Sequence, residues 1–169
     1  FEYAELLSFS KEAIASGIEA LKRRCPIVTD TRMAEAGINR SLLQALGGRV
    51  ICSLDESKAE RVAEEQNITR AMVSIIRIAE REKEAIFLIG NAPTALFTLL
   101  ELFQMEKGES PLVICVPVGF VGAREAKEAL REYPVPSITT RGPKGGTSVA
   151  VAILHALFLL AKEENHGKE

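Results

Sequence analysis

The chain has 169 residues, of which 47% are hydrophobic and 26% charged, and its formal net charge is −2. This balance predicts a folded domain with a substantial core and excludes a disordered chain. No long basic run occurs, tryptophan is absent and only 5% of the residues are aromatic, so the composition does not favour nucleic acid as a partner. No apolar stretch reaches the roughly 18 residues that a membrane span needs, so no membrane partner is expected.

The first half of the chain predicts helices that alternate with two short strands. Asp30 directly follows the first strand, where its carboxylate is expected to cap the next helix rather than act in catalysis. Thr69 is expected to cap the last helix of this half in the same way. The predicted elements are helices over 3–23, 31–36, 40–46, 55–65 and 69–82, and strands over 26–29 and 49–54.

The second half repeats one pattern three times: a short apolar run, a turn rich in glycine and proline, and a helix. The predicted strands cover 85–89, 112–116 and 137–140, and the turns after them cover 90–94, 117–122 and 141–147. Runs of this kind are typical of strands buried on both faces of a parallel sheet. The fold expected for residues 1–169 is a single α/β domain with a central, mainly parallel sheet of about five strands flanked by helices.

The final predicted helix, over 147–161, is apolar almost all round. A helix of this kind is buried on two sides, either under the sheet and a neighbouring helix or in a subunit interface. A homodimer is therefore expected.

The three turns indicate where a ligand binds. They follow the carboxyl ends of parallel strands, where free backbone N–H groups and positive helix ends favour an anion. The dinucleotide fingerprint G-x-G-x-x-G is absent, and Lys144 precedes the pair Gly145-Gly146, which is the wrong order for a P-loop. A carboxylate at the start of the last helix fits the pattern better than a nucleotide.

Several segments resemble one family. Residues 89–96 contain Gly-Asn-Ala-Pro-Thr and residues 117–123 contain Pro-Val-Gly-Phe-Val, followed by Glu125 and Lys127. With 27–30 and 141–146, these segments resemble the precorrin-8X methylmutase (cobalt-precorrin-8 methylmutase) family over essentially the whole chain.

The resemblance implies an isomerase of cobalamin biosynthesis. Such an enzyme moves a methyl group from C11 to C12 of precorrin-8X or cobalt-precorrin-8, which gives hydrogenobyrinic or cobyrinic acid. It implies no cofactor and no bound metal, and a homodimer that holds the tetrapyrrole near the subunit boundary. Whether the natural substrate carries cobalt is left open.

The resemblance places the catalytic histidine outside these residues. The acid/base histidine of the family lies in a segment resembling Arg-Val-Ile-His, upstream of Phe1, so an N-terminal segment is expected to be missing and these residues alone are expected to turn over substrate poorly. His155 lies within the apolar last helix, where the family usually carries asparagine, and is expected to be a core or interface residue. His166 lies in a polar tail.

A flat ring fringed by carboxylates requires an apolar slot with N–H donors and a few cations at its rim. Arg70 is the first candidate for such a cation, against the alternative of a solvated helix residue, and Phe120 could pack on the ring or in the core. The predicted substrate-binding residues are Thr69, Arg70, Asn91, Ala92, Pro93, Thr94, Gly119, Phe120, Lys144, Gly145, Gly146 and Thr147.

Two other functions also fit the sequence: a corrinoid-binding protein without isomerase activity, and an unrelated anion-binding α/β enzyme. The three cysteines, Cys25, Cys52 and Cys115, are widely spaced and lack the spacing of a metal site. Buried reduced thiols are expected, and with them a cytoplasmic protein.

Overall fold

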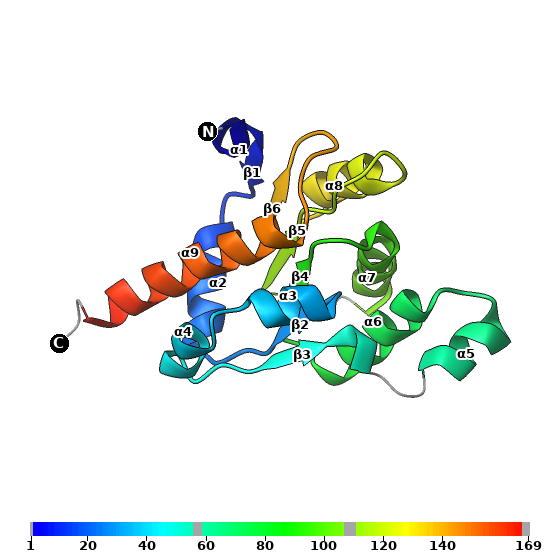
Figure 1. The fold of residues 1–169 in the computed structure, drawn as a ribbon, viewed down its shortest axis with the longest axis horizontal. Coiled ribbons are helices and arrows are strands. Elements are labelled where there is room, and N and C mark those ends of the chain that lie inside the picture. Colours follow the sequence, from blue (N-terminus) through cyan, green and yellow to red (C-terminus); the bar gives the residue numbers. More distant parts are fainter. Residues whose placement is uncertain (1, 56–58, 107–110, 167–169) are drawn as a thin grey trace.

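A six-stranded sheet forms the centre of the computed structural model, which describes residues 2–55, 59–106 and 111–166 (Figure 1). Its strand order is β1-β6-β5-β4-β2-β3, and every neighbouring pair is parallel except β1 with β6. The strands are β1 (Leu7–Phe9), β2 (Ile27–Thr29), β3 (Val50–Cys52), β4 (Ile86–Ile89), β5 (Leu112–Cys115) and β6 (Ser137–Thr140). The predicted α/β fold and its mainly parallel sheet are confirmed.

Helices cover both faces of this sheet, because alternate residues of the buried strands point to opposite sides. Ile86 and Leu88 of β4 belong to one core cluster, whereas Phe87 and Ile89 belong to the other. The first face carries α2 (Ala13–Lys22), α3 (Arg32–Gly37), α4 (Arg40–Ala45) and α9 (Thr147–His166). The second carries α6 (Arg70–Arg81), α7 (Pro93–Glu106) and α8 (Ala123–Glu132), with α5 (Ala59–Gln66) packed against α6.

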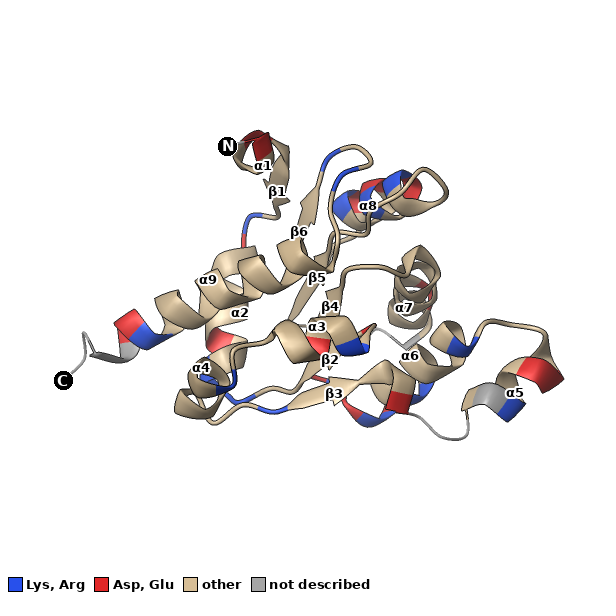
Figure 2. Ribbon diagram, in the orientation of Figure 1, with Lys and Arg blue, Asp and Glu red and all other residues tan. Residues whose placement is uncertain are grey.

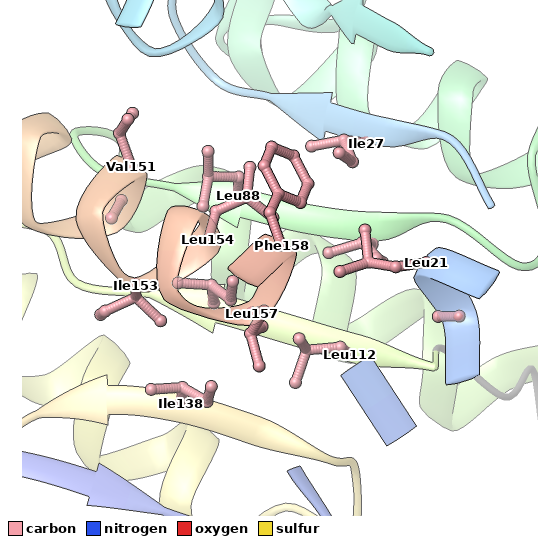
Figure 3. Close-up of a cluster of buried hydrophobic side chains, with 14 of the residues drawn as sticks. Leu21, Ile27, Leu88, Leu112, Ile138, Val151, Ile153, Leu154, Leu157 and Phe158 are labelled. Atoms are coloured by element: carbon pink, nitrogen blue, oxygen red, sulfur yellow. The ribbon is translucent and has the colours of Figure 1, made fainter. Parts of the chain in front are cut away.

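Helix α9 is the centre of the first core cluster. Its side chains, among them Leu154, Leu157 and Phe158, point toward Ile27 of β2 and Leu112 of β5 (Figure 3). The helix also packs on α2, so the structure shows the first of the two predicted alternatives, burial under the sheet and a neighbouring helix. Figure 2 shows a helix free of charged residues until its last turns, in contrast to the densely charged α8.

The single helix predicted over 3–23 is wrong. The structure has α1 (Glu2–Leu6), then β1, then α2. Strand β1 pairs with the exposed edge of β6, with Leu7 opposite Thr140, and Ser10 continues the contact through its N–H bond to the Ser137 carbonyl, at 2.9 Å. Backbone pairing with a strand far along the chain therefore overrides the local helical spacing.

Two other predictions need correction. Asp30 does not cap α3, because Thr31 occupies that position and its Oγ1 accepts from the Ala34 N–H at 3.1 Å. The helix expected over 55–65 begins at Ala59, and a 3₁₀ turn, η1 (Ser53–Asp55), follows β3 instead. Residues 56–58 lie outside the described part of the chain.

Within the described ranges, the structure has no helix that is both long enough and apolar enough to cross a membrane.

Candidate functional site

The three glycine-bearing turns meet at the carboxyl edge of the sheet, as the sequence predicts. The Gly119 N–H donates to the Pro143 carbonyl at 3.1 Å, which joins the β5–α8 loop to the β6–α9 loop. The Gly146 N–H donates to the Val116 carbonyl at 2.6 Å, which joins the same two loops a second time.

Glycines allow these turns to approach so closely. A Cβ atom at Gly145 would lie 2.1 Å from the Val116 carbonyl oxygen, and one at Gly90 would lie 2.6 Å from the Thr147 Cα. Both distances are far shorter than any van der Waals contact, so these two positions require glycine. The β4–α7 turn therefore lies directly against the start of α9.

The β4–α7 turn already holds a carboxylate. Asp30, at the end of β2, is only 5% exposed, and its Oδ2 accepts the N–H groups of Gly90, Asn91 and Ala92 at 3.2, 2.7 and 2.9 Å. Burial raises the pKa of Asp30, and the three N–H bonds offset part of this rise. The N–H groups of Asn91 and Ala92, two predicted binding residues, therefore point inward to Asp30.

The start of α9 offers donors instead. Thr147 and Ser148 are its first two residues, and their N–H groups have no acceptor among the described residues. These N–H groups lie at the positive end of a 20-residue helix, where an anion is stabilised. Lys144, just before them, is exposed and forms an ion pair with Glu2 that raises its pKa.

A buried lysine supports this loop. Lys127 of α8 is completely buried, and its Nζ donates to the Lys144 carbonyl at 2.8 Å and to the Thr140 Oγ1 at 3.1 Å. Thr140 Oγ1 donates to the same carbonyl at 2.7 Å. Burial lowers the pKa of Lys127. The sequence did not reveal this role, since a lysine on a charged helix normally lies in solvent.

The β5–α8 loop presents apolar side chains to solvent. Phe120 and Val121 are 94% and 91% exposed, and Val118 is 54% exposed. The core-packing alternative for Phe120 is therefore wrong. Apolar side chains gathered beside polar turns mark a ligand or partner surface.

The remaining predicted residues fall in two places. Asn91 and Thr94 are exposed at the start of α7, and Pro93 is its first residue. Thr69 caps α6, and Arg70 donates from its guanidinium to the Leu54 carbonyl at 2.7 Å. Thr69 and Arg70 thus lie beside η1, which follows β3, on the far side of β2 from the three turns.

His155 is tied to the scaffold. Its Nε2 accepts the Asn39 N–H at 2.9 Å, and its ring centroid lies 5.9 Å from that of Phe158. Burial lowers its pKa, which favours the neutral ring that this bond requires. The side chain of His166 lies outside the described residues.

One cluster has the composition of a metal site. Ligand atoms of Glu35, Cys52 and Asp55 lie within 4.8 Å of one another. Glu35 is ion-paired with Arg40, and Asp55 with Arg32, so cationic side chains already balance both carboxylates. We assign no metal to this cluster.

Two cavities differ in character. A groove of about 490 Å³ runs along α9 from the turn edge and is almost entirely apolar; Tyr3, Phe9, Ile14, Val149, Ile153 and Leu160 line it. We call it the α9 groove. A larger cavity of about 1010 Å³ lies at the opposite end of β5 and β6, and its lining contains Glu12, Glu19, Glu84 and Arg23. This acidic lining does not suit a ligand fringed by carboxylates.

A doubly wound sheet with three glycine turns at the carboxyl edge of its parallel strands is characteristic of α/β proteins whose small-molecule ligands bind at that edge. The family model for precorrin-8X methylmutase matches residues 1–160. The chain therefore belongs to the precorrin-8X methylmutase family. This membership excludes the alternative of an unrelated anion-binding enzyme.

Individual relatives agree with this assignment. The cobalt-precorrin-8 methylmutase of Salmonella typhimurium is 45% identical over 164 residues, which cover 96% of this chain and 76% of that protein. The protein of the same name from Methanocaldococcus jannaschii is 44% identical over 163 residues, 96% of this chain and 74% of its own length. The crystal structure of precorrin-8X methylmutase from Thermus thermophilus superposes with a TM-score of 0.89 at 39% identity, covering 97% of this chain and 79% of that one.

Proposed function

We propose that the protein is the isomerase of cobalamin biosynthesis that moves a methyl group from C11 to C12 of precorrin-8X or cobalt-precorrin-8. The observation that carries this proposal is the family match over residues 1–160, together with the meeting of its three glycine turns at one edge. The product is hydrogenobyrinic acid, or cobyrinic acid for the cobalt-containing substrate. A migration within one conjugated ring requires no redox step, and protonation of the ring by a general acid lowers its barrier.

The substrate is a tetrapyrrole, and we place it over the carboxyl edge of the sheet. Phe120 and Val121 supply exposed apolar surface for the ring, and the N–H groups of Thr147 and Ser148 supply donors for a carboxylate at its periphery. Lys144 adds a cation at the rim. Arg70 would contact only a group that reaches past the end of β2.

The test is conversion of precorrin-8X by the purified full-length gene product, followed through the absorption spectrum and through the position of a ¹³C-labelled methyl group. Label at C12 is the expected result. Tight binding of hydrogenobyrinic acid without conversion would favour the second candidate, a corrinoid-binding protein without isomerase activity. Absence of both would contradict the proposal.

We also propose a homodimer in which the α9 groove contacts a second copy. Tyr3, Phe9, Ile14 and Leu160 line this groove and are all exposed, an arrangement typical of a protein–protein contact. The groove begins beside Val149, close to the donors of α9, so a second copy seated there would adjoin the substrate. Sedimentation should show a dimer that Phe9→Glu converts to monomer; a monomeric parent protein at micromolar concentration would contradict this.

The three cysteines are buried and free, which fits a reducing compartment. We place the protein in the cytoplasm on this basis. Fractionation of cells that express the whole protein tests this placement.

A further inference from the structure

Asp30 binds a turn that lies 60 residues further along the chain. Its Oδ2 accepts three successive backbone N–H groups, those of Gly90, Asn91 and Ala92. Successive N–H groups that converge on one point form an anion-binding nest, and bonds from such groups to a carboxylate are charge-assisted. The β4–α7 turn is thus an anion site filled by the protein's own side chain.

The position of Asp30 in the fold is also distinctive. From β2 the chain continues to β3 on one side, whereas β4, β5 and β6 extend the sheet on the other. Asp30 therefore lies at the point where the strand order reverses, which is where ligands bind in open α/β sheets. The turn that it holds lies against Thr147, since Gly90 leaves no room for a Cβ there.

The burial of the Asp30 carboxylate is unfavourable. Its Oδ1 is buried and has no hydrogen-bond partner among the described residues, and burial raises the pKa of Asp30. Buried, imperfectly satisfied groups concentrate at functional sites.

We propose that Asp30 is a positioning residue of the binding edge. It fixes the β4–α7 turn, and with it Asn91 and Thr94, against the start of α9. Because it fills the N–H groups of this turn, it leaves Thr147 and Ser148 as the donors for a carboxylate of the substrate. This inference rests on the proposed corrinoid substrate and specifies which N–H groups bind its carboxylate.

The test compares Asp30→Ala, Asp30→Asn and the control Glu35→Ala. The control removes a carboxylate of α3 that is paired with Arg40 of α4. Affinity for hydrogenobyrinic acid is measured by absorbance titration, with melting recorded in parallel. We expect Asp30→Ala to bind hydrogenobyrinic acid at least tenfold more weakly than the parent. Asp30→Asn should stay within threefold of the parent affinity, because its amide oxygen still accepts the N–H groups. Glu35→Ala should bind like the parent. Added formate, which fits the space left by the carboxylate, should restore the affinity of Asp30→Ala.

A folded Asp30→Ala protein with parental affinity would overturn the proposal. So would formate that restores the melting temperature but not the affinity, because the carboxylate would then support only the fold. Failure of the unmodified chain to bind hydrogenobyrinic acid would instead contradict the proposed function, so the two failures are distinguishable.

A measurement on the unmodified chain keeps the proposal testable if Asp30→Ala does not fold. In amide hydrogen exchange, Gly90, Asn91 and Ala92 should be protected both with and without hydrogenobyrinic acid, whereas Thr147 and Ser148 should gain protection on binding. Gly90–Ala92 amides that exchange freely until the corrinoid binds would overturn it.

Discussion

The β4–α7 and β6–α9 turns lie side by side at one edge of the sheet, and both are rich in glycine and proline. The backbone N–H groups of the first turn are bound to a side chain of the protein, whereas, within the described residues, two N–H groups that follow the second turn are free to bind a ligand. In the first turn, three N–H groups bind the buried carboxylate of Asp30. In the second, the Gly146 N–H binds Val116, and the N–H groups of Thr147 and Ser148 at the start of α9 have no acceptor in the described part of the chain. A glycine-rich turn after a parallel strand thus identifies an anion site, but not whether the anion comes from the protein or from a ligand.

The largest effect is expected where the second turn touches the backbone of its neighbour. Gly145→Ala places a Cβ 2.1 Å from the Val116 carbonyl oxygen, which the rigid backbone cannot avoid. We expect a loss of roughly 3–5 kcal/mol in the free energy of unfolding, measured by urea denaturation. The control is Gly142→Ala in the same loop, where a Cβ meets no atom within 4 Å and only the φ of +70° opposes it, at about 1–2 kcal/mol. Equal losses of unfolding free energy in both variants would contradict a close contact between Gly145 and the Val116 carbonyl.

Gly146→Val tests whether the second turn binds the ligand. The φ of +114° at Gly146 is strained for any other residue, so about 1–3 kcal/mol of stability should be lost. The shifted start of α9 should also cost one or two charge-assisted hydrogen bonds to the ligand, which corresponds to roughly tenfold or more in corrinoid affinity. Titration with hydrogenobyrinic acid measures this on the folded protein. Unchanged corrinoid affinity would show that the β6–α9 turn does not bind the ligand. Neither turn would then offer donors to it.

Lys144→Gln tests the rim cation of the same turn. Its ion pair with Glu2 is exposed, so the pair itself contributes little to stability. We expect corrinoid affinity to fall a few-fold and to become less dependent on salt. Glu2→Gln is the matched control, because it frees the same lysine and should leave the affinity equal or higher. Weaker binding in both variants would indicate that the ion pair, and not the free cation, shapes the site.

The smallest effect concerns a contact remote from both turns. Burial lowers the pKa of His155 in the folded state, so the unfolded chain binds the proton more readily. Stability should therefore fall as the pH drops below about 6.5, by up to about 1 kcal/mol as the bond from Asn39 is lost. In His155→Gln, which keeps an acceptor for the Asn39 N–H, this part of the pH dependence should disappear. An identical pH profile for both proteins would show that His155 does not titrate in this range.

Much of the fold follows from local pattern. The apolar runs over 85–89, 112–116 and 137–140 predict buried parallel strands because no other short element buries every side chain. Asn39 and Thr69 predict helix starts correctly, since a cap needs only the residues that follow it. The edge strand β1 could not be predicted, because its partner β6 lies about 130 residues away and nothing local distinguishes Leu7–Phe9 from a helix.

For the site, the sequence alone determined which turns carry glycine and that they follow parallel strands, and hence that they share one edge. Only the tertiary structure decided what each turn binds. Asp30 reaches the β4–α7 turn from β2, and Lys127 reaches the β6–α9 loop from α8, because strand order and helix packing bring these separate segments together. Hydrogen bonds between such segments depend on distances in space, and spacing along the chain does not encode those distances.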